Sequence, residues 1–134
     1  MRLLTRLVTG IVRLFDRRAI IDWHAPDNTL MAFTRLVPPG ARAWTLGNIY
    51  LISPSVQESA DELNLTMIHE YVHVLQYRAQ GILFLLRYLR QGLWDWTHNI
   101  YEQQAMQIEA WYRDHPELTQ PWELRELIRR LIKS

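Results

Sequence analysis

The sequence contains no cysteine. Disulfide bridges are therefore excluded, and so are thiolate ligands for a metal ion. Any metal site in this protein has to be built from histidine, aspartate or glutamate. This restriction is informative, because the chain has only five histidines and two of them lie four residues apart.

Long hydrophobic runs are also missing. The longest apolar stretch, residues 82–93, is interrupted by Arg87 and Arg90, so it is too short and too charged to span a bilayer. The first residues include arginines, as a secretory signal does, but Arg13 breaks the apolar run and no small-residue cleavage site follows. We therefore expect no cleaved leader, which favours a cytoplasmic or membrane-peripheral location.

Neither sign of charge is in large excess, since 15 lysines and arginines are balanced by 14 acidic residues. Their distribution is uneven. Residues 1–18 contain five arginines and one aspartate, and residues 123–134 contain four basic and two acidic residues, whereas the middle of the chain is acidic. No basic stretch is interleaved with aromatic residues, so we expect no nucleic-acid partner.

The composition that is present fits one globular domain spanning residues 1–134. Hydrophobic residues make up 49% of the chain and charged residues 22%, and a chain of this length can bury a core of its own. Strand-like patterns come first and helical patterns follow. This order predicts an α+β fold in which a small antiparallel sheet precedes a helical C-terminal part.

Residues 3–15 have the spacing of an amphipathic helix with arginines on its polar side. Such a basic helix, contained in residues 1–18, could lie on an anionic membrane surface. It could instead pack against the protein's own core, which we favour because most amphipathic helices in small domains do so. Its apolar positions are Leu3, Leu4, Leu7, Val8, Ile11, Val12, Leu14 and Phe15.

Strands are expected at residues 20–23, 30–37 and 42–52. The sequence Pro38-Pro39-Gly40 predicts a turn between the last two, so that the three stretches form an antiparallel meander. Within the last stretch, Gly47-Asn48 predicts either a bulge or a second tight turn.

The most informative motif is the H-E-x-x-H string His69-Glu70-Tyr71-Val72-His73. On a helix the two histidines lie about one turn apart on the same face, where both imidazoles can bind one metal ion. Glu70 follows the first histidine, so its carboxylate can approach a water molecule on that ion. Nitrogen ligands, an open position and a base are what a zinc hydrolase requires.

Five letters alone are not decisive, because this composition would give the string by chance in roughly one such chain in a hundred. The surroundings strengthen it. Residues 62–79 carry apolar side chains at helical spacing, Ser59, Asp61 and Asn64 offer N-cap groups, and Gly81 stands where the helix would end. The alternative is an ordinary amphipathic helix whose histidines have no metal.

Further helices are expected over residues 82–91 and 97–113, and from about Pro121 onwards. The second of these is expected to provide the third protein ligand of a zinc site. We favour Glu102, since Ala105 one turn later allows close helix packing. The other candidates are Asp95, His98, Glu109, Asp114 and His115.

His98 lies four residues before Glu102, on the same helical face. It could replace Glu102 as a ligand, or act in catalysis by donating to a developing oxyanion, for which Tyr71 and Tyr101 are alternatives. Glu109 lies two turns beyond Glu102, too far to share the ion, but it could orient an imidazole. A further polar residue, Gln76, could bond across the helices or face solvent.

Two segments resemble a known family of enzymes. They are His69-Glu70-x-x-His73-x-x-Gln76, with a glycine soon after, and Asn99-x-Tyr101-Glu102-x-x-Ala105. Over roughly residues 44–112 the chain is similar to small bacterial zincin-like metallopeptidases of the gluzincin kind, and to the metallopeptidase-like domain of extracellular contractile injection systems. The resemblance implies a small antiparallel sheet followed by the active-site helix, with zinc on His69, His73 and Glu102 and with Glu70 as base.

The chain departs from the family at three positions around the downstream glutamate. Ile100 stands where a proline is frequent, Gln104 where an acidic residue is frequent, and Met106 where larger gluzincins have an aspartate that orients a histidine. The three ligands are thus present, while the residues expected to support them differ.

These patterns predict zinc-dependent hydrolysis of a peptide bond, with an extended peptide substrate pairing along residues 46–52. One alternative is a zinc-binding scaffold without catalysis. Glu70 argues against it, because a structural site has no use for a base and would be closed by a fourth ligand, such as His98. Another is a membrane-peripheral adaptor that acts through residues 1–18.

Overall fold

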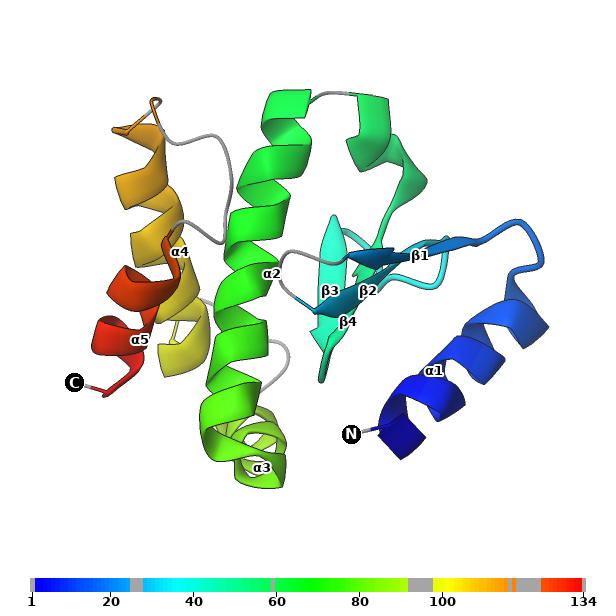
Figure 1. Cartoon of the computed structure of the whole chain (residues 1–134), viewed down its shortest axis with the longest axis horizontal. Helices are drawn as coiled ribbons and strands as arrows, with labels where there is room; N and C mark the ends of the chain where they lie inside the picture. Colours follow the sequence, from blue (N-terminus) through cyan, green and yellow to red (C-terminus); the bar gives the residue numbers. More distant parts are fainter. Residues whose placement is uncertain are drawn as a thin grey trace. The chain divides into compact units, whose positions relative to one another are not determined.

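The computed structural model describes residues 2–24, 28–58, 60–91, 98–115, 117 and 124–133. It has the expected α+β architecture, with a small sheet early in the chain and a helical C-terminal part (Figure 1). The chain forms two compact units, Met1–Thr66 and Met67–Ser134. Among the described residues, no helix is long and apolar enough to cross a membrane.

The sheet of the first unit is mixed. Its strands are β1 (Ile20–His24), β2 (Thr29–Phe33), β3 (Ala43–Leu46) and β4 (Ile49–Ile52), in the order β1-β2-β4-β3. The two outer pairs are antiparallel, but β2 and β4 are parallel, so the expected antiparallel meander is wrong for the central pair. All four residues of β4 are buried, and a strand of this kind is stable between two others.

The central place of β4 also corrects the expected substrate contact. Because β4 is hydrogen-bonded to β2 on one side and to β3 on the other, it has no free edge for an added peptide strand. The pairing of a substrate along residues 46–52 is therefore not available at β4.

Both predicted turns form, but only one joins neighbouring strands. Gly47-Asn48 is the tight turn of the β3–β4 hairpin, and Gly47 has a φ of 61°, which favours glycine. The other turn is closed by a 3.0 Å hydrogen bond from Ala41 N to Pro38 O, with a φ of 79° at Gly40. It lies in the connection that carries the chain from β2 past the place of β4 to β3.

Helix α1 (Arg2–Phe15) packs one of its two apolar rows against the sheet. Val8 and Val12 are buried in a cluster with residues of β2 and β4, and Leu4 is partly buried beside them. The expected core packing is confirmed for this row. A second apolar row of the same helix remains exposed.

The second unit consists of helices. Their bounds are α2 (Ala60–Gln80, of which the first residues belong to the first unit), α3 (Ile82–Gln91), α4 (Ile100–Arg113) and α5 (Arg125–Lys133), and a short 3₁₀ helix, η1 (Pro54–Glu58), precedes α2. From Thr66 to Tyr77 every residue of α2 except His69 is buried. Helix α2 is therefore a central helix, not an amphipathic surface helix.

The ends of these helices agree largely with the expected ones. Gly81, with a φ of 61°, ends α2, and its N–H donates to the Tyr77 carbonyl at 2.6 Å. Asp61 and Asn64 lie inside α2 and do not cap it, whereas Ser59 lies outside the described residues. The expected helix start near Pro121 also lies outside them.

Candidate metal centre

Two histidines of α2 and one glutamate of α4 converge in the second unit. One donor atom from each of His69, His73 and Glu102 lies within 4.8 Å of the other two, an arrangement that could hold a metal ion. The two imidazoles meet edge to face, with ring centroids 5.1 Å apart, because residues four apart share one face of a helix. The structure thus brings together the three ligands predicted from the sequence.

Glu102 presents one carboxylate oxygen to each ring. Its Oε2 lies 3.0 Å from His69 Nε2, and its Oε1 lies 3.2 Å from His73 Nε2. Glu102 is the third residue of α4, whose N-cap is Asn99; the Asn99 side chain accepts a hydrogen bond from Tyr101 N at 3.0 Å. The positive end of the helix dipole therefore faces a carboxylate that is almost completely buried.

Glu102 remains ionised in spite of its burial. Removal from water alone would raise the pKa of this carboxyl group, but the neighbouring rings of His69 and His73 and the hydroxyl of Tyr88 hold it far below its ordinary range. A permanent negative charge is thereby placed between two imidazoles.

The hydrogen bonds of Gln76 fix the proton of His73. Gln76 Nε2 donates to the Tyr101 carbonyl at 3.1 Å and to Gln104 Oε1 at 2.9 Å, so its Oε1 is an acceptor and lies 2.8 Å from His73 Nδ1. Nδ1 therefore carries the proton, and the lone pair of a neutral ring is on Nε2. This confirms that Gln76 bonds across the helices.

His73 Nε2 is consequently an unsatisfied buried atom. It lies 3.2 Å from Glu102, near enough for an ion pair with a protonated ring, yet it makes no hydrogen bond there. In the neutral ring a lone pair would face a carboxylate oxygen, which is repulsive unless a cation lies between them. The donor set therefore fits a metal ion.

His69 has an outer partner of its own. Its Nδ1 lies 3.3 Å from Glu109 Oε2, and Glu109 is in turn held by Arg113 at 2.9 Å. Burial lowers the pKa of His69, but the carboxylates of Glu102 and Glu109 more than offset this and raise it to about 10. Without a metal ion, the proton of this charged ring occupies the position that a cation would take.

Glu70 is buried, and it follows His69 directly in α2. Its negative charge is one of the smaller contributions to the raised pKa of both His69 and Tyr88. A carboxylate next to a metal position can accept a proton from a water molecule there.

Tyr88 of α3 is the residue at the site that the sequence reasoning missed. Its hydroxyl donates to Glu102 Oε1 at 2.5 Å, and its ring lies edge to face with His73, with centroids 6.0 Å apart. Burial and the Glu102 carboxylate raise the pKa of Tyr88 above its ordinary value, so it remains a donor. One signal was available: Phe84 and Tyr88 form an aromatic pair at i and i+4, on a different face from the leucines of α3.

The other predicted donors do not join the three ligands. His98 is exposed, just before the N-cap of α4. The hydroxyl of Tyr71 accepts a hydrogen bond from Arg125 Nε at 2.8 Å, and that of Tyr101 donates to Gln80 Oε1 at 3.0 Å. Asp114 and His115 lie at the far end of α4, and Asp95 lies outside the described residues.

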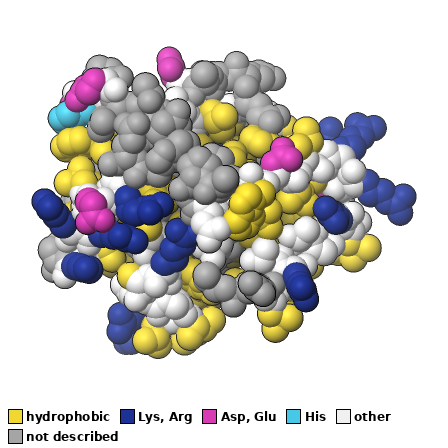
Figure 2. All heavy atoms as spheres, in the orientation of Figure 1, with side chains coloured by type: hydrophobic (Ala, Val, Ile, Leu, Met, Phe, Trp, Pro, Cys, Tyr) yellow, Lys and Arg dark blue, Asp and Glu magenta, His cyan; other side chains and the backbone are white. Residues whose placement is uncertain are grey.

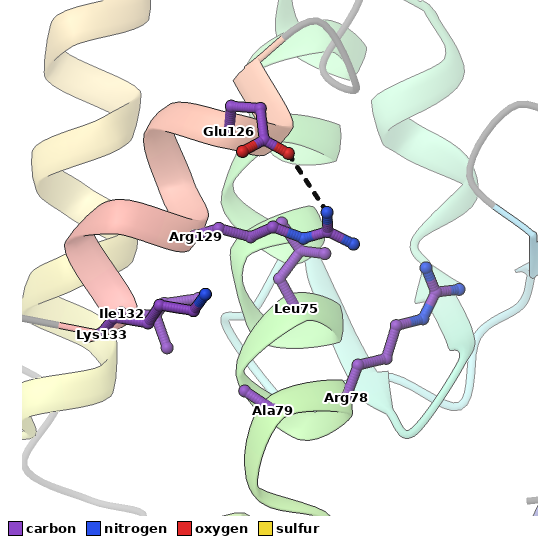
Figure 3. Close-up of a pocket in the computed structure, with 7 residues that line it drawn as sticks. All are labelled: Leu75, Arg78, Ala79, Glu126, Arg129, Ile132 and Lys133. Atoms are coloured by element: carbon purple, nitrogen blue, oxygen red, sulfur yellow. Dashed lines mark hydrogen bonds and ion pairs between the residues drawn. The ribbon is translucent and has the colours of Figure 1, made fainter.

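A surface hollow of about 300 Å³ lies elsewhere in the second unit, between α2 and α5 (Figure 3). Its lining includes Arg78, Arg129 and Lys133, and Arg129 is paired with Glu126 at 3.2 Å. Because Arg78 lies on the side of α2 opposite to His69 and His73, this hollow is separate from the metal centre.

Comparisons with family models, curated proteins and solved structures find no match for this chain. The chemistry of the centre therefore has to be inferred from its own donors and their partners.

Proposed function

We propose that this protein is a zinc-dependent peptide hydrolase whose metal ion is bound by His69, His73 and Glu102. Two imidazoles and one carboxylate form the ligand set of catalytic zinc sites that keep an open position. The observation that carries the proposal is the buried Nε2 of His73, which has no hydrogen-bond partner and faces a carboxylate. A cation satisfies both groups.

The outer partners support the same conclusion. Histidines that bind metal ions usually donate their second N–H to a carboxylate, an amide or a carbonyl group, which fixes the tautomer. Gln76 takes this role for His73 and Glu109 for His69. Tyr88 holds Glu102 in a similar way. The departures from the gluzincin pattern at Gln104 and Met106 thus leave neither histidine without support.

Zinc in such a site supplies a Lewis acid and lowers the pKa of water. Proton transfer in the reaction requires a protein side chain. We assign Glu70 as the general base that accepts a proton from the attacking water and returns it to the leaving amine. A structural site would have no use for this buried carboxylate, which favours hydrolysis over a silent scaffold.

The test combines metal analysis with a matched pair of variants. The purified protein should contain about one zinc ion per chain. Glu70→Gln should retain that zinc but lose hydrolysis of a mixed peptide library by about 10²–10⁴-fold, whereas Glu126→Gln, which alters an exposed glutamate of α5, should behave as the wild type.

Two results would count against the proposal in different ways. A wild-type protein that acquires no zinc would remove the metal centre itself. A protein that binds zinc but cleaves no peptide, with or without Glu70, would be the scaffold.

A further inference from the structure

Helix α1 carries two apolar rows with different surroundings. The inner row, Leu4, Val8 and Val12, packs on the sheet. The outer row, Leu3, Leu7, Ile11, Leu14 and Phe15, is between 44% and 81% exposed. With about 100° of rotation per residue, the centre of the outer row lies roughly 100° around the helix from that of the inner row.

Basic side chains border the outer row on its other side. Arg6 and Arg13 are exposed, and Arg17 and Arg18 follow at the end of the helix. On the face drawn in Figure 2, hydrophobic and basic side chains lie side by side over α1. The helix itself contains no acidic residue.

The carboxylate that follows α1 in the sequence, Asp16, accepts hydrogen bonds within the first unit. Asp16 Oδ2 accepts from Thr34 Oγ1 at 2.8 Å and from Arg35 N at 2.9 Å, and these hydrogen bonds hold the pKa of Asp16 below its ordinary value. Asp16 therefore attaches the end of α1 to the segment after β2. Together with the inner row, it fixes which side of the helix the outer row faces.

We infer that α1 is a docking surface for an anionic phospholipid bilayer, with the outer row inserted at the boundary between headgroups and acyl chains. A large apolar row beside cations is what such a surface attracts, and each arginine near an anionic leaflet adds to binding. A second copy of this chain is a poorer occupant, since it would bring arginines against arginines with no carboxylate on either helix.

Vesicle co-sedimentation of the full chain tests the inference. The protein should bind vesicles of phosphatidylcholine with phosphatidylserine much more tightly than vesicles of phosphatidylcholine alone, and binding should weaken as salt is added. The double variant Leu7→Gln/Leu14→Gln should reduce binding at least about tenfold. Its matched control, Leu83→Gln/Leu86→Gln, removes two leucines of α3 that are also more than half exposed and should have no effect.

A second pair of variants tests the charge. Arg6→Gln and Arg13→Gln should each weaken binding to the phosphatidylserine vesicles by roughly fivefold, and their combination should flatten the salt dependence. Arg129→Gln on α5, an arginine whose side chain is half exposed, should leave binding unchanged.

The absence of cysteine allows a direct readout of insertion. An environment-sensitive dye on Leu7→Cys should shift to the blue when phosphatidylserine vesicles are added, and the same dye on Leu86→Cys should not. The inference is overturned if the wild type binds neither vesicle, if the dye shifts only at position 86, or if sedimentation shows a dimer that Leu7→Gln/Leu14→Gln dissociates.

Discussion

Helices α1 and α2 depart from ordinary helix amphipathicity in opposite ways. Helix α1 leaves five large apolar side chains exposed to water, whereas α2 takes His73, Glu70 and Gln76 out of it. Each arrangement is unfavourable in isolation, because apolar area in water and unsatisfied polar atoms in a core both destabilise a folded chain.

The two helices differ in the kind of group that is left without a partner, polar atoms in α2 and apolar side chains in α1. In α2, His69 is paired with Glu102 and Glu109, and Gln76 with the Tyr101 carbonyl. Among the described residues of α2, the buried side-chain atoms without a partner are Thr66 Oγ1 and His73 Nε2, and His73 Nε2 lies next to a carboxylate. The exposed residues of α1 form a continuous row beside cations. According to the two proposals, a small cation would complete α2 and an extended anionic surface would cover α1.

The largest expected effect distinguishes the candidate ligand His73 from the alternative ligand His98. His73→Ala should lower zinc affinity by at least about 100-fold, because it removes one of the three proposed ligands, whose Nε2 atom has no hydrogen-bond partner. His98→Ala should leave the affinity unchanged. Competition with a chromogenic chelator measures both, and the opposite pattern would make His98 the ligand.

A smaller loss is expected from the outer partner of His73. Gln76→Leu keeps the volume but removes the acceptor of the Nδ1 proton, so we expect zinc affinity to fall by about 10–100-fold. Gln80→Leu, which alters a glutamine one turn later on α2, is the matched control. Equal affinities of the two variants would mean that Gln76 supports only the packing of α2 on α4.

The pH dependence of stability tests the charge of His69 in the metal-free protein. Its pKa in the folded chain is about 10, against 6.5 in the unfolded chain. The stabilisation is therefore fully present below pH 6.5 and is lost as the pH rises towards 10. In the presence of a chelator, Tm should fall over this window for the wild type and less steeply for His69→Gln. If Tm fell equally with pH in the wild type and in His69→Gln, the imidazole of His69 would not be protonated in the metal-free protein.

Zinc affinity should change in the opposite direction with pH. The ion has to displace the proton of His69, so binding should tighten as the pH rises and should release a proton. Calorimetry in buffers of different ionisation enthalpy measures that release. Binding without proton release would exclude His69 as a ligand that is protonated in the metal-free state.

The smallest effects concern the two rows of α1. Val12→Ala in the inner row should reduce the free energy of unfolding by about 1–3 kcal/mol, because it leaves a cavity against the sheet. Leu7→Gln in the outer row should change it by no more than about 0.5 kcal/mol. Chemical denaturation measures both, and a large loss for Leu7→Gln would show that the outer row is packed in solution.

The convergence of the three candidate ligands could be predicted because the placement of each follows from local geometry. His69 and His73 share a helical face by spacing alone, and Gly81 marks the end of that helix. Glu102 was favoured by a similar local argument, because a small residue, Ala105, follows it at i+3 inside the expected helix. All three arguments depend on residues a few positions apart.

What could not be predicted depends on contacts between distant segments. The turn at residues 38–40 was correctly located, yet nothing near it indicates that β4, and not β3, pairs with β2. In α3, Leu86 and Leu89 are more than half exposed, whereas Phe84 is buried and the Tyr88 hydroxyl bonds Glu102. Aromatic packing against Tyr101 decides the rotation of this helix.

The position of Glu102 in the first turn of α4 has a consequence for the kinetics of metal exchange. First turns of helices open more often than helix interiors. Each opening of this turn would withdraw Glu102 from both histidines, so fraying of the helix would set the rate at which an ion enters or leaves the proposed site. Asn99, whose side chain caps that turn, would then control the lifetime of an ion in the proposed site although it is not one of the three candidate ligands.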